Sequence, residues 1–60
     1  EYFIKAIEIK ERLTKENPEK YIEKLADAYY NAAKFYNDHG QIKIAEEYFL
    51  KRIEVILMMN

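Results

Sequence analysis

The chain has no cysteine, no serine and no tryptophan, and it contains a single glycine and a single proline. Without cysteine, no disulfide can reinforce the fold. Thr14 is the one threonine and has no evident base partner, so catalysis by a hydroxyl nucleophile is not expected. His39 is the one histidine, and the sequence shows neither a zinc-ligand spacing nor a glycine-rich phosphate loop. These absences favour a protein that is not an enzyme and that binds no cofactor or metal.

The charge balance and the apolar runs narrow the class of partner. The formal net charge is −1, so the chain lacks the basic surplus that binding to nucleic acid requires. No apolar run reaches the ~18 residues of a membrane span. We also find no signal-peptide pattern, and we therefore expect a cytoplasmic protein. Half of the residues are apolar, which favours a packed core over disorder.

Three long helices are predicted, over residues 2–16, 18–39 and 41–59. Pro18 disfavours helix at Asn17, and the same two residues suit the N-cap and first position of the next helix. Gly40 fits the left-handed position that ends a helix. Because the connections are this short, consecutive helices should lie antiparallel. The predicted fold class is all-α, with residues 1–60 forming a single unit.

Each predicted helix carries an apolar stripe at spacings of three and four residues. The first has Tyr2, Ala6, Ile9 and Leu13, widened by Phe3 and Ile7. The second has Ile22, Leu25, Tyr29, Ala32 or Ala33, and Tyr36. The third has Ile42, Ala45, Phe49, Ile53 and Ile56, beside a second line of Ile44, Tyr48, Val55 and Met59. We expect these main stripes to face the core.

The two ends of the chain are near copies. Residues 1–9 read EYFIKAIEI and residues 47–55 read EYFLKRIEV, so six of nine positions are identical at an offset of 46. Self-similarity at a fixed period is typical of repeat proteins, in which one small unit cannot bury its apolar face alone and stacks on a neighbour. A chain of 60 residues also buries only ~60% of its unfolded surface. Both facts favour a protein that works by contact with other protein surfaces.

The segment around Gly40 resembles a tetratricopeptide repeat. The family pattern of aromatic, small, tyrosine, glycine, alanine and aromatic positions is matched by Tyr29, Ala33, Tyr36, Gly40, Ala45 and Phe49. The period of 46 is longer than the usual 34, and is similar to the repeats of the kinesin light-chain type. The resemblance implies about one and a half repeats of an α-solenoid. Residues 1–16 would be the second helix of a preceding repeat and residues 17–60 one complete extended repeat.

The same resemblance implies a peptide-binding groove along the second helix. In this family the first helix of each unit lines a concave surface that holds extended peptides. Carried over to this chain, the groove residues would be Asp27, Tyr30, Asn31, Lys34 and Asn37. Asn31 matches the asparagine that pairs with a ligand backbone in the family. An ordinary solvated helix face is the alternative interpretation.

The end of the third helix is apolar almost all round. Lys10, Glu11 and Arg12 of the first copy become Ile56, Leu57 and Met58 in the second. An apolar helix end of this kind is normally covered. A following repeat, a second copy of the chain or a different protein could provide the cover, and we favour a second copy. The predicted contact residues are Val55, Ile56, Leu57, Met58 and Met59.

These observations predict a non-catalytic module for protein–protein interaction and scaffolding of the tetratricopeptide type. Its partner would be a protein or peptide held along the second helix, and the isolated chain would form a homo-oligomer. The alternative is a structural module that associates only with itself and has no peptide groove.

Overall fold

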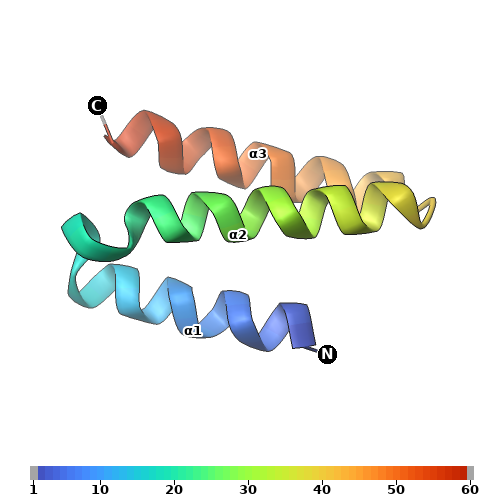
Figure 1. Cartoon of the computed structure of the whole chain (residues 1–60). Coiled ribbons are helices and arrows are strands. Elements are labelled where there is room, and N and C mark those ends of the chain that lie inside the picture. The colour runs from blue at the N-terminus through green and yellow to red at the C-terminus, as the bar shows by residue number, and fades with distance from the viewer. Residues whose placement is uncertain (1, 60) are drawn as a thin grey trace.

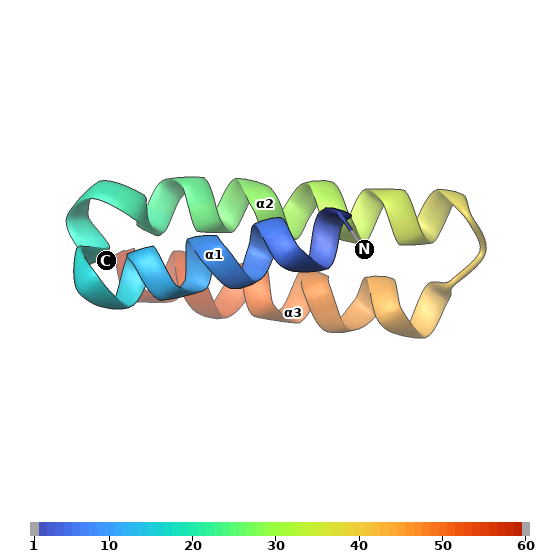
Figure 2. The same cartoon turned by 90° about the horizontal axis from the view of Figure 1, so that it is seen from below.

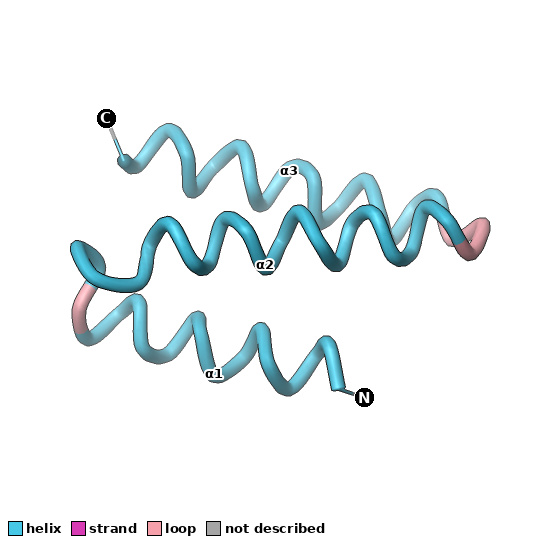
Figure 3. Tube along the Cα trace, viewed as in Figure 1, coloured by secondary structure: helices cyan, strands magenta, loops and turns pink. Residues whose placement is uncertain are grey.

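The computed structural model describes residues 2–59 and the side chains of residues 4–58. It contains three helices, α1 (Tyr2–Glu16), α2 (Pro18–Asp38) and α3 (Ile42–Met59), and no strand within the described range (Figures 1 and 3). The predicted all-α class is therefore confirmed. The helix bounds differ from the prediction by no more than one residue at any end.

The central helix is α2, with α1 and α3 packed on it and both antiparallel to it (Figures 1 and 2). Over residues 2–59, the backbones of α1 and α3 do not approach each other directly. The Cα atoms span 33 × 24 × 12 Å, which describes a thin slab of three rods.

The two connections are tight, and their backbone hydrogen bonds explain why. The Asn17 N–H bonds the Leu13 carbonyl at 2.9 Å, and the Asn17 carbonyl accepts from Lys20 and Tyr21 at 3.2 Å each. Asn17 occupies the N-cap position and its backbone carbonyl accepts the first bonds of α2, but its side chain makes no capping bond. A single residue therefore joins α1 to α2.

The second connection ends α2 at Gly40, whose φ of 78° confirms the predicted left-handed conformation. The Gln41 N–H bonds the Tyr36 carbonyl at 2.8 Å, and the Gly40 N–H bonds the Asn37 carbonyl at 3.1 Å. This pair of bonds is the Schellman arrangement, which satisfies carbonyls that the helix end would otherwise leave open. A side chain at residue 40 would meet no neighbour, so the backbone angle alone explains the glycine.

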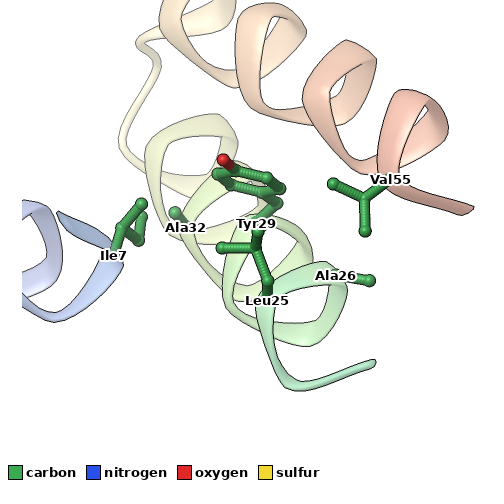
Figure 4. Packing of buried hydrophobic residues seen from close by; sticks show 6 residues of the cluster. All are labelled: Ile7, Leu25, Ala26, Tyr29, Ala32 and Val55. Atoms are coloured by element: carbon green, nitrogen blue, oxygen red, sulfur yellow. The ribbon is translucent and has the colours of Figure 1, made fainter. Parts of the chain in front are cut away.

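The core runs along α2 and takes one or two side chains from each neighbouring helix. Figure 4 shows the ring of Tyr29 between the α1 and α3 sides of the cluster, with Ala32 beside Ile7. The buried cluster consists of Ile7, Leu25, Ala26, Tyr29, Ala32 and Val55. Ala33 and Ala45 are also buried. Methyl-sized side chains on α2 let the flanking helices approach closely, which leaves room for the larger rings.

The predicted stripe of α2 is confirmed, whereas those of α1 and α3 are partly wrong. In α1, Ile7 is buried as predicted, whereas Ile9 was expected in the core but is 48% exposed. The side chains of Tyr2 and Phe3 lie outside the described range. In α3, Ile42 and Ile53 were expected inside but are half exposed. Val55, from the second line, fills the core. Both helices carry apolar residues on two faces, and only the position of α2 decides which face is buried.

Candidate protein-interaction surfaces

A row of tyrosine rings joins α2 to α3. The Tyr36 and Tyr48 rings stack with centroids 5.9 Å apart and planes 8° from parallel, and Tyr48 lies 6.1 Å from Tyr29. Lys51 Nζ lies 5.7 Å from the Tyr48 centroid and 5.9 Å from that of Tyr29. Burial raises the pKa of Tyr48. Three of the six tyrosines, Tyr29, Tyr36 and Tyr48, therefore take part in the packing of α2 on α3.

Tyr29 also ties α2 to α1. Its hydroxyl donates a hydrogen bond of 2.5 Å to Glu11 Oε2. Burial, reinforced by this bond and by the negative charge of Glu11, raises the pKa of Tyr29 far above its ordinary value. The other buried polar group, Thr14, donates to the Lys10 carbonyl at 2.7 Å. Among the described side chains, no buried polar atom lacks a partner.

The residues predicted to form a peptide groove lie on exposed parts of α2. Asp27, Asn31 and Lys34 follow one another at helical spacing on the side that faces neither α1 nor α3. Asn37 is exposed on the neighbouring line, together with Tyr30. Two hollows found in the described surface are lined by other residues. A groove along this side of α2 thus stays a prediction.

Tyr30 is held in place by α3, although it is partly exposed. Its ring meets Phe49 edge-on with centroids 6.2 Å apart, and the Arg52 guanidinium lies 5.1 Å from its centroid. Arg52 stands where the first copy has Ala6, so the large cation is accommodated by packing on an aromatic face. Of the five predicted groove residues, Tyr30 is thus the one with ring and cation contacts to another helix.

Large apolar side chains are exposed along the length of α3. Five of them recur at spacings that place them on one face, and each is more than a third exposed. They are Ile42, Phe49, Leu50, Ile53 and Leu57, which we call the α3 outer stripe. The exposed fraction reaches 68% at Leu57. The exposed Glu46 lies within this row, and an exposed apolar row of this kind is a candidate interaction surface.

The predicted contact residues at the end of α3 separate into two groups. Val55 is 7% exposed and belongs to the core, and Ile56 packs against the core. Leu57 and Met58 are exposed on different sides of the helix. The side chain of Met59 lies outside the described range. Of the predicted contact residues, Leu57 and Met58 are thus the ones with described, exposed side chains, and their contact with a partner stays a prediction.

A groove between α1 and α3 was not predicted from the sequence. It has a volume of about 750 Å³, and its floor includes Leu25, Tyr29 and Val55. Its α1 wall carries two acids and two bases, Glu8, Glu11, Arg12 and Lys15. Those three floor residues are buried, and the exposed Met58 lines the groove from α3. Two of its charged lining residues, Glu11 and Arg12, are positions at which the second copy has Leu57 and Met58.

Within the part of the chain that the structure describes, no group of three histidine, cysteine, aspartate or glutamate side chains could hold a metal ion. None of the helices between residues 2 and 59 is long and apolar enough to cross a membrane. Comparison with known proteins finds no matching family model, no matching curated protein and no matching solved structure.

Proposed function

We propose that this chain is a non-catalytic protein–protein interaction module and that the α3 outer stripe is its main contact surface. The observation that carries the proposal is the row of half-exposed large apolar side chains along that stripe. Burying a large aliphatic side chain contributes roughly 1.5–3 kcal/mol relative to leaving it in water. Burial of several such side chains of the α3 outer stripe would therefore strongly favour association with a partner.

The resemblance to the tetratricopeptide family supports the same class of function. The small positions that carry the resemblance, Ala33 and Ala45, are buried between α2 and α3, where close approach of the two helices needs them. In this proposal the exposed side of α2, with Asn31 and Tyr30, is a second contact surface for a peptide. A cytoplasmic location belongs to the same proposal and rests on the sequence alone.

Binding of the labelled chain to an array of helical and extended peptides tests the proposal. Ile53→Asp places a charge in the middle of the α3 outer stripe and should remove binding that uses this stripe. Ile9→Asp is the matched control, because Ile9 is equally exposed but lies on α1. Asn31→Ala should remove only binding that uses the α2 surface. Absence of saturable binding to any peptide would contradict the proposal.

Self-association is a second candidate, favoured by the exposure of Leu50, Leu57 and Met58. Light scattering coupled to size exclusion should then show a mass that rises above that of the monomer with concentration. Ile53→Asp should return it to the monomer, and Ile9→Asp should not. A strict monomer at every concentration up to the millimolar range would remove this candidate.

A further inference from the structure

The charges of α3 reverse their signs when the helix is read from its other end. From its first turn to its last, their order is positive, negative, negative, positive, positive and negative. If a second α3 is laid antiparallel about Phe49, every charge comes level, to within one residue, with a charge of the opposite sign. The level pairs are Lys43 with Glu54, Glu46 with Arg52, and Glu47 with Lys51. In a parallel pair in register each charge would instead stand beside its own copy, so the pattern favours the antiparallel orientation.

The α3 outer stripe is centred on the same point as the charges. Phe49 and Leu50 lie at its middle, and Ile42 and Leu57 lie seven residues to either side of that pair. An antiparallel two-fold therefore brings the middle of the stripe onto itself and each end onto the opposite end. An interface between two identical copies needs this self-complementarity, because the same surface serves on both sides.

Glu46, the charge that interrupts the apolar row, gains a partner in this arrangement. It comes level with Arg52 of the second copy, whose guanidinium lies 5.1 Å from the centroid of the Tyr30 ring in its own chain. A guanidinium packed on a ring keeps its N–H groups directed outward in its own plane, where a carboxylate can accept them. The carboxylate of Glu46 would therefore enter the apolar contact with an opposite charge beside it, which offsets the cost of burying it.

Lys43 and Glu54 border the stripe on the same edge. Each directly follows a stripe isoleucine, Ile42 or Ile53, and the eleven residues that separate the two charges are close to three helical turns. Both side chains are exposed. A two-fold axis places this edge of one copy against the same edge of the other, so Lys43 of each copy lies beside Glu54 of its partner. Two such pairs would flank the apolar contact.

From these matches we infer that the α3 outer stripe binds the same stripe of a second copy of this chain, in an antiparallel two-fold pair centred near Phe49. The inference rests on the proposed function and names the partner and its orientation. The apolar side chains of the stripe supply the attraction between the two copies. The charges decide the orientation, because only the antiparallel pair places opposite signs together along the whole helix.

Charge reversal at the edge of the stripe tests the inference. In either single variant, Lys43→Glu or Glu54→Lys, both edge pairs become pairs of like charge. Sedimentation equilibrium of the whole chain at low salt should show each variant dimerising about tenfold more weakly than the native chain. An equimolar mixture of the two variants should recover native association, because each heterodimer again pairs opposite charges at both edge sites. Charges that only stabilise α3 from within would act in each chain separately, so mixing the variants could not restore association.

Two charge reversals on α1, Lys5→Glu and Glu8→Lys, are the matched controls. They change the net charge by the same amounts, and Glu8 matches Glu54 at the offset of 46. Both control variants should dimerise like the native chain. A double variant with Lys43→Glu and Glu54→Lys in one chain should do so too, because it exchanges the two signs at each edge pair.

The possible failures separate this inference from the broader proposal. Dimerisation that Ile53→Asp abolishes but that neither edge reversal weakens would overturn the antiparallel arrangement and leave the stripe as an interaction surface. A native chain that stays monomeric up to millimolar concentration, and that binds peptides through Ile53, would overturn the second copy as the occupant and leave the proposed function standing. A monomer that also binds no peptide would overturn both.

Discussion

The first and last helices have nearly the same nine-residue sequence but bury opposite faces. In α1, the face with Ile7 packs on α2 and the face with Ile9 is open to water. In α3, the residue that matches Ile9, Val55, is in the core, and the residue that matches Ile7, Ile53, is half exposed. Both helices pack on α2 but not on each other, and each turns a different face of the shared pattern toward α2 (Figure 1).

This difference shows that an apolar residue does not by itself specify burial. The shared segment has two apolar faces, and a neighbour on each side is needed to cover both. Each helix has only one such neighbour among the described residues. In α1, charged residues at positions 10–12 follow the uncovered apolar face and end it. In α3, the uncovered apolar face continues as far as Leu57. The contrast supports α3, rather than α1, as the proposed interaction surface.

The largest expected difference in stability is between truncations of Ile7 and Ile53, which occupy matching positions in the two copies. Ile7→Ala should lower the free energy of unfolding by about 2–4 kcal/mol, because it opens a cavity against Ala32. Ile53→Ala, at the same place in the second copy, should cost less than about 0.5 kcal/mol. Urea denaturation followed by circular dichroism measures both. Equal losses of stability in the two variants would contradict the burial of Ile7 and the exposure of Ile53.

At the other matched pair of positions, Ile9 and Val55, the variant in α3 should lose more stability than the variant in α1. Val55→Ala removes two buried methyl groups and should cost about 1–3 kcal/mol. Ile9→Ala lies at the matching position of α1 and should cost under about 0.5 kcal/mol, because its side chain is already half in water. The same urea titration applies. A larger loss in Ile9→Ala than in Val55→Ala would contradict the packing of α1.

The Tyr29–Glu11 bond exists in the first copy alone, so its removal sharpens the comparison. Tyr29→Phe should cost about 1 kcal/mol at neutral pH. The pKa of Tyr29 is raised in the folded protein, whereas in the unfolded chain it ionises near 10. The stabilisation is therefore complete below about pH 10 and is lost as pH rises beyond that value.

Denaturation midpoints measured between pH 8 and 11 test the sign of this effect. The native chain should lose stability steadily above pH 10, and Tyr29→Phe should lose less. Some loss will remain in the variant, because burial also raises the pKa of Tyr48. Identical slopes for the native chain and the variant would show that Tyr29 does not contribute.

The smallest expected effect concerns the one large difference between the copies, Ala6 against Arg52. Arg52→Ala removes the cation from the face of Tyr30 and should cost about 0.5 kcal/mol. The double variant Arg52→Ala with Tyr30→Leu measures their coupling in a thermodynamic cycle. A coupling indistinguishable from zero would mean that Arg52 only fills space beside the ring.

The sequence was a good guide to the helices and a poor guide to their faces. Pro18 and Gly40 define the boundaries because their backbone preferences act locally. The face that α1 or α3 buries depends on where α2 lies, which is a non-local property that periodicity does not contain. For the same reason the groove between α1 and α3 was not predicted. The exposure of Asn31 and Lys34 was expected, because α2 has a single apolar side.

The stacked pair of Tyr36 and Tyr48 has a practical consequence. The two rings lie on either side of the α2–α3 contact, in a chain that has no tryptophan to mask their optical signal. Near-ultraviolet circular dichroism reports fixed aromatic packing. The hairpin of α2 and α3 thus contains its own spectroscopic marker, so detachment of α1 can be distinguished from opening of the hairpin without adding a label.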